Sequence, residues 1–130
     1  MSRKFALQVG GQKVVAELLD KQAPRVAEQF WNTLPLQSFA IHAKFAGGEM
    51  IVMVPFYRDT ENEVLNVQPG DIGYFPDMQT ICVFYDEVTP FGYVSVFARI
   101  TDGLAELQPV ARSLMERVSL PVQISREDGA

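Results

Sequence analysis

The residues best suited to acid/base chemistry are one histidine and one carboxylate. His42 is the only histidine of the chain, and an unperturbed imidazole titrates near neutral pH. Glu49 follows Gly47 and Gly48 and opens an apolar run over residues 50–54. If Glu49 points into a barrel, it must be paired or protonated, because an unpaired buried carboxylate is costly. We expect both groups to meet in one cavity as an acid/base pair. The structural alternatives are a hydrogen-bonded strand histidine and a strand-end carboxylate in solvent or capping backbone N–H groups.

Several aromatic side chains and one cysteine could line the same cavity. The candidates for ligand contacts are Tyr57, Tyr74, Cys82, Phe84 and Tyr85. Tyr74 lies among glycines that let the backbone approach closely, and we expect it to orient a ligand together with Tyr85. Cys82 would need a base to act as a nucleophile, and His42 is the only histidine that could serve. The alternative is that the rings pack in the core or rim and that Cys82 is a small buried hydrophobe.

The acidic residues within 59–63 and the absence of known catalytic motifs exclude several classes of function. Asp59, Glu61 and Glu63 lack the glycine and the later glutamate of an EF-hand loop, so we expect solvated loop charges there rather than a metal site. The chain contains no HExxH, GxGxxG, phosphate-loop or nucleophile-elbow motif. These absences argue against zinc proteases, nucleotide enzymes and α/β-hydrolases. We expect no metal and no cofactor.

The elements that must position these residues are mostly strands. Alternating apolar residues on either side of Gly10 and Gly11 predict a hairpin. An apolar stripe over residues 23–34 predicts a helix with Pro24 in its first turn, and Pro35 ends it. Asp102 can cap a late helix, which we expect Pro109 to break into two pieces. Further strands are expected over residues 36–45, 50–54, 72–75, 80–85, 93–100 and 118–124.

Composition indicates one globular domain over residues 1–130. The chain is 48% hydrophobic and 21% charged, and its net charge is −5. It lacks the basic stripe with stacking aromatics that is typical of nucleic-acid binding. No window is apolar enough to span a membrane, and no long apolar stretch follows the first basic residues as in a signal peptide. With a single cysteine, a cytoplasmic protein is expected.

Two sequence strings and the element order resemble the cyclophilins. The string VVAELLDKQAPRVAEQFWNTLP resembles the cyclophilin opening, and VFARITDGLAEL resembles its late passage from strand to helix. The strings HAKFAGGEM and PGDIGYFPDMQTICVFY look more like bacterial and archaeal cyclophilin-like families of unknown function. This resemblance implies a mainly β fold, namely a closed or nearly closed eight-stranded cyclophilin-like β-barrel with two helices.

The chain departs from the cyclophilins at the residue that carries their activity. Cyclophilins have an arginine on the strand after the first helix, whereas this chain has none between Arg25 and Arg58. We therefore expect a small-molecule enzyme of hydrolase, isomerase or lyase type, acting on a polar carbonyl or cyclic amide compound at the barrel mouth. The alternatives are a non-catalytic metabolite- or peptide-binding module and a weak peptidyl-prolyl isomerase. Trp31, Phe91 and Tyr93 could form an apolar patch for homo-oligomer contacts.

Overall fold

The first two strands form the predicted hairpin, because glycines occupy the two turn positions that need positive φ angles. Gly10 and Gly11 have φ values of 57° and 80°, which glycine adopts without steric cost.

The computed structural model describes residues 3–44, 46–88 and 93–127. Its elements are β1 (Lys4–Val9), β2 (Gln12–Leu18), α1 (Pro24–Asn32), β3 (Leu36–His42), β4 (Gly47–Met53), β5 (Glu63–Val64), β6 (Asp71–Phe75), β7 (Thr80–Val88), β8 (Val94–Asp102), α2 (Leu104–Ser113), a 3-10 turn (Leu114–Glu116) and β9 (Leu120–Glu127).

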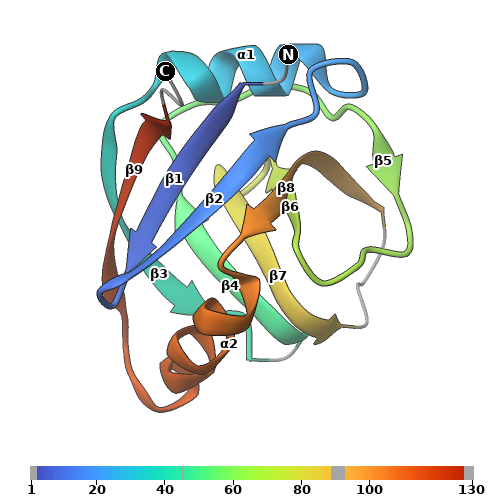
Figure 1. The fold of residues 1–130 in the computed structure, drawn as a ribbon. Coiled ribbons are helices and arrows are strands. Elements are labelled where there is room, and N and C mark those ends of the chain that lie inside the picture. The colour runs from blue at the N-terminus through green and yellow to red at the C-terminus, as the bar shows by residue number, and fades with distance from the viewer. Residues whose placement is uncertain (1–2, 45, 89–92, 128–130) are drawn as a thin grey trace.

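Eight of the strands close into an antiparallel barrel. They follow one another in the order β2, β1, β9, β3, β4, β7, β6 and β8, and β8 pairs back with β2. Strand β5 pairs with the start of β8 and lies outside the barrel wall (Figure 1). Closure leaves these eight strands without a free edge. The mainly β barrel with two helices is thus confirmed.

Side chains from the strands and both helices fill the barrel. Helix α1 lies across one end of the barrel and α2 across the other (Figure 1). Val26, Ala27 and Phe30 of α1 and Leu107 of α2 are buried in the main core. The Phe30 ring contacts that of Phe5 from β1, with ring centroids 4.8 Å apart. Neither helix in this part of the chain is long and apolar enough to cross a membrane.

A second hydrophobic cluster lies on the outer face of the barrel wall. We call it the outer cluster. Directly opposed residues of an antiparallel pair share a face, so the register assigns Ile51 of β4 and Cys82 of β7 to the same side. The part of the chain around β5 adds Val64 and Val67 to this side, where both pack against the cluster. Its buried members are Ala43, Ala46, Ile51, Cys82, Phe84, Val94 and Val96.

Three details of the predicted elements were wrong. Helix α2 continues through Pro109, which is exposed and removes only one backbone donor from a ten-residue helix. Asp102 does not cap it, because Gly103 takes the N-cap position with a φ of 96°. The closing strand begins at Leu120 rather than at Val118, which is 91% exposed.

The short strand β5 was not predicted, and the three residues of the predicted apolar patch can be described only in part. Two residues of strand leave too little periodicity to recognise in the sequence. Trp31 is partly buried, with the guanidinium groups of Arg3 and Arg126 5.2 and 4.7 Å from its ring centroid. Tyr93 is 63% exposed, and Phe91 lies outside the described residues.

Candidate functional site

The backbone that carries Glu49 is shaped by two glycines. Between Gly47 and Glu49 the pairing of β4 with β7 shifts register, which is a bulge. A Cβ on Gly48 would lie 2.5 Å from the Cβ of Asp86, so β7 approaches β4 too closely for a larger residue. Gly47 has a φ of 99°, which also favours glycine. Bulges of this kind re-aim side chains and are frequent beside active sites.

The bulge directs Glu49 onto the outer face of the wall. Glu49 pairs with Phe84 of β7, a member of the outer cluster, and is only 7% exposed. Burial raises the pKa of its carboxyl, and the neighbouring Cys82 thiol partly opposes that rise. The result is a carboxyl among apolar side chains, which is the environment that tunes acids for proton transfer near neutral pH.

Asp71, another buried carboxylate of the chain, shows how different the setting of Glu49 is. Asp71 is 4% exposed, receives a hydrogen bond from the backbone N–H of Gln68 at 2.9 Å and pairs with the Arg99 guanidinium at 3.1 Å. Within the described residues no ion pair involves Glu49. Asp71 therefore has the partners of a structural carboxylate, and Glu49 does not.

Cys82 lies beside Glu49 and is not activated as a nucleophile. It is fully buried, and burial, followed by the nearby Glu49 charge, raises the pKa of its thiol far above the ordinary value. A thiol in such surroundings is protonated and unreactive at neutral pH. The structure does not place His42 next to it, since His42 lies on the opposite face of the wall.

His42 belongs to the barrel interior. It pairs with Met50, a core residue, and its Nε2 lies 2.7 Å from the hydroxyl of Tyr85. Its Nδ1 is buried and has no hydrogen-bond partner among the described residues. Burial, and then the charge of Lys44, lowers the pKa of the imidazole. His42 is thus a neutral, inward-facing histidine that shares one hydrogen bond with Tyr85.

The predicted sharing of one cavity by His42 and Glu49 is wrong. His42 lies on the Met50 side of β4, and Glu49, the neighbour of Met50, points to the other side. Spacing in the sequence shows which residues share a face within one strand. It does not show which face of β3 matches which face of β4, because that depends on how the two strands pair. The structure therefore provides two separate polar centres, Glu49 with Cys82 outside the wall and His42 with Tyr85 inside it.

The other predicted ligand contacts divide between these regions. Phe84 lies in the outer cluster with Glu49. Tyr74 is fully buried in the main core, where its hydroxyl donates to the carbonyl of Phe56 at 2.7 Å. Tyr57 is 61% exposed in the chain that follows β4. The structure thus brings Phe84 and Cys82 to Glu49 but neither tyrosine.

The acidic loop has a structural role that the sequence did not reveal. A carboxylate oxygen of Glu61 accepts a hydrogen bond from the backbone N–H of Val26 at 2.7 Å, so the loop caps α1. The N-cap residue itself, Ala23, has no side chain that could do so. Among the residues that the structure covers, no group of three or more His, Cys, Asp or Glu is arranged to hold a metal.

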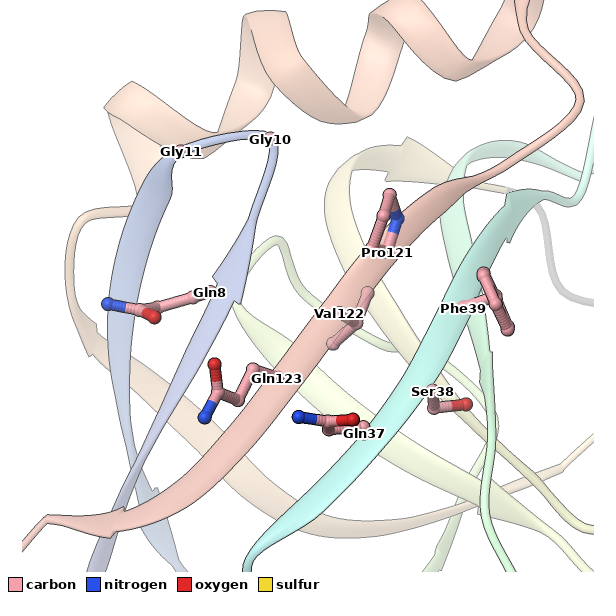
Figure 2. A pocket seen from close by; sticks show the side chains of 9 residues that line it. All are labelled: Gln8, Gly10, Gly11, Gln37, Ser38, Phe39, Pro121, Val122 and Gln123. Atoms are coloured by element: carbon pink, nitrogen blue, oxygen red, sulfur yellow. The ribbon is translucent and has the colours of Figure 1, made fainter.

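A hollow of about 720 Å³ lies away from both polar centres, on the outer face of β1, β9 and β3 (Figure 2). Its side chains include three glutamines, Gln8, Gln37 and Gln123. Sequence reasoning missed them, because these residues lie on strands far apart in the chain and only the register aligns them. Isolated glutamines give no signal that would have revealed the hollow.

Comparison with known proteins supports the fold but names no activity. Two similar solved structures are McbB in complex with tryptophan, with a TM-score of 0.86 and 18% identity, and the hypothetical protein AF2241 from Archaeoglobus fulgidus, with a TM-score of 0.69 and 21% identity. The matches cover 97% of this chain in both cases, 45% of the McbB chain and 95% of AF2241. No curated protein matches significantly. One family model matches residues 5–126, and the chain therefore belongs to that family, described as "Protein of unknown function (DUF3830)".

Proposed function

We propose that this protein is a small-molecule enzyme in which the carboxyl of Glu49 transfers a proton to or from a ligand held at the outer cluster. The observation that carries the proposal is a buried carboxyl that lies among apolar side chains and forms no ion pair within the described residues. The ionised form of Glu49 lacks the ion pair and backbone hydrogen bond that stabilise Asp71. The carboxyl therefore lowers the stability of the fold and has no structural role that would explain it. Perturbed acids of this kind are concentrated at functional sites.

One carboxyl is sufficient for the chemistry. With a raised pKa, Glu49 can take a proton from a carbon next to a carbonyl and return it to the product. The apolar side chains around it would exclude water and strengthen its electrostatic interactions. We therefore keep a hydrolase, isomerase or lyase reaction on a polar carbonyl or cyclic amide compound and assign its proton transfer to Glu49 alone.

The likeness to McbB favours a small organic ligand. That protein was determined in complex with tryptophan, which combines an aromatic ring with a carboxylate. Phe84 and the valines of the outer cluster would suit the apolar part of such a ligand. At 18% identity the likeness itself concerns the fold, so tryptophan serves here as a first test compound.

The other expectations remain alternatives. A non-catalytic metabolite- or peptide-binding module would use the same apolar surface without needing the carboxyl. A cyclophilin-like relationship and weak prolyl isomerase activity stay predictions, the latter disfavoured by the lack of an arginine between Arg25 and Arg58. A cytoplasmic location also stays a prediction, based on the single cysteine.

Solvent exchange tests the proposal through its proton-transfer step alone. The protein is incubated in D₂O with tryptophan, simple 2-oxo acids and cyclic amides, and proton NMR follows the loss of signal at carbons next to a carbonyl. We expect exchange or product formation with at least one class. Glu49→Gln should slow it by about 100-fold or more, the usual range for a lost general base.

A matched substitution separates chemistry from general damage. Glu63→Gln makes the same change at an exposed position on β5 and should retain the wild-type rate. Circular dichroism confirms that both variants fold. Equal rates in wild type and Glu49→Gln would overturn the assignment, and binding without exchange, unaffected by Glu49→Gln, would favour the binding module.

A further inference from the structure

The hollow on the outer face of β1, β9 and β3 has the form of a shallow groove lined by amides. We call it the glutamine groove. Its lining residues are Gln8, Gly10, Gly11, Gln37, Ser38, Phe39, Pro121, Val122 and Gln123. The hairpin turn at Gly10 and Gly11 bounds one end (Figure 2). None of these side chains is charged.

The three glutamines form one row across neighbouring strands. Gln8 of β1 is directly opposite Gln123 of β9, and Gln123 is directly opposite Gln37 of β3. Figure 2 shows their amides side by side across these strands. Strands lie about 4.8 Å apart, so the row is about 10 Å long from first to last. All three side chains are exposed and can bind a ligand without leaving a core.

A second row of the groove is apolar. Phe39 of β3 is directly opposite Pro121 of β9, two residues along from the glutamine row. The Phe39 ring is 60% exposed, so its face is accessible to a ligand in the groove. The groove thus combines amide donors and acceptors with an aromatic surface next to them.

These properties fit a neutral, hydroxyl-rich chain. Each glutamine amide offers two N–H donors and one carbonyl acceptor, which matches hydroxyl groups that both donate and accept. An exposed phenyl ring can pack against the C–H face of a sugar ring. Linked sugar rings repeat at about the spacing of neighbouring strands, so a row of three amides can contact successive units.

Other ligand classes fit less well. β1 and β9 are paired on both sides along the groove, whereas β3 pairs there with β9 and reaches β4 only from Ala40 to His42. A peptide strand could therefore add only beside residues 36–39 of β3, which is a short edge. Phosphate-containing ligands require basic side chains, and the lining has none. Lys13, the next residue in the glutamine row, is engaged by Glu127 at 3.3 Å.

We propose that the glutamine groove binds a neutral oligosaccharide. Gln8, Gln123 and Gln37 hydrogen-bond hydroxyl groups of successive sugar units, and Phe39 packs against one ring. The groove lies on different strands from Glu49, so this binding is independent of the proposed enzyme activity.

NMR titration with defined oligosaccharides tests the proposal. The ¹⁵N-labelled protein is titrated with the tetrasaccharides of glucose in β-1,4 and α-1,4 linkage, with chitotetraose and with the corresponding monosaccharides. We expect at least one tetrasaccharide to shift resonances of β1, β9 and β3 and to bind more tightly than its monosaccharide. Gln123→Ala should weaken this binding about fivefold, as expected for one lost neutral hydrogen bond.

Two further variants make the result decisive. Phe39→Ala should weaken binding about tenfold, and Gln22→Ala, at an exposed glutamine away from the groove, should leave it unchanged. The proposal is overturned if no neutral tetrasaccharide shifts the groove resonances at millimolar concentration, or if binding survives both groove substitutions. It is also overturned if light scattering shows a dimer that Phe39→Ala dissociates, because a second copy would then cover the groove. Ile41 and Met53, exposed on β3 and β4, make that outcome worth measuring.

Discussion

The hydroxyl of Tyr74 offers a sharp test of whether this side chain serves the fold or a ligand. It donates to the carbonyl of Phe56 at 2.7 Å and accepts from the backbone N–H of Arg58 at 3.2 Å. Tyr74→Phe removes only the oxygen and keeps the ring, which stacks on Phe56 with centroids 4.8 Å apart. The substitution isolates two hydrogen bonds that anchor the chain after β4.

The structure sets the size of the expected effect. Phe56 is buried, so its carbonyl would lose its partner away from water, at a cost of about 1–3 kcal/mol. Arg58 is exposed and its N–H can reach water, so it adds little. We expect a loss of about 2 kcal/mol in the free energy of unfolding. With an unfolding entropy of about 2.1 cal/mol/K per residue over 130 residues, the Tm should fall by roughly 7 °C.

Thermal and urea unfolding measure this loss, and a neighbouring tyrosine provides the control. Tyr57→Phe makes the same change on a ring that is 61% exposed and should alter the unfolding free energy by less than about 0.5 kcal/mol. If Tyr74→Phe were as stable as the wild type, the anchoring interpretation would fail. If it also weakened binding of a ligand, the sequence interpretation of Tyr74 as a ligand contact would be right.

Three further predictions concern Glu49, His42 and Glu61. Burial raises the pKa of Glu49 in the folded state, so stability should fall as the pH rises from its usual value of 4.5 towards the folded value. Glu49→Gln should lack this fall in urea unfolding between pH 4 and 8, and an unchanged pH profile would contradict the inferred burial. Burial lowers the pKa of His42, so stability should be complete above its usual value of 6.5 and decrease as the pH falls through that value. His42→Gln should remove that decrease, and its persistence in the variant would assign it to other groups. Glu61→Ala should cost about 1 kcal/mol in unfolding free energy, because the N–H of Val26 loses its cap, whereas Glu63→Ala should cost little. Equal losses in the two variants would show that the cap contributes nothing.

Local patterns in the sequence predicted most of the fold. The glycine turn between β1 and β2 and the apolar stripe of α1 depend on neighbouring residues, and both were confirmed. The continuation of α2 through Pro109 was missed, because packing of Leu107 and Ala111 into the core outweighs the loss of one hydrogen bond. The continuation of the helix depends on burial in the tertiary structure, which rules based on neighbouring residues cannot predict.

The candidate site was harder to predict, because it depends on register. The unusual position of Glu49 after two glycines was visible in the sequence, and the structure explains both glycines. Which face Glu49 occupies depends on the bulge, and a shift of one residue reverses the face of every side chain in a strand. The same dependence hid the alignment of Gln8, Gln37 and Gln123. Spacing along the chain can nominate residues, but only pairing between strands brings them together.

The architecture of the barrel itself favours chemistry on its outer face. An eight-stranded barrel is just wide enough for its own side chains to fill it, and both ends are covered by helices whose buried residues belong to the core. A ligand at His42 would have to displace part of that packing. At Glu49, which is 7% exposed, a ligand would have to displace only side chains of the outer cluster, against which Val64 and Val67 pack from outside the barrel wall. Elements outside a closed barrel can vary without loss of the core, which is how one scaffold accommodates different ligands. A ligand that acts through Glu49 should therefore protect the amides around β5 from hydrogen exchange and leave those around His42 unchanged.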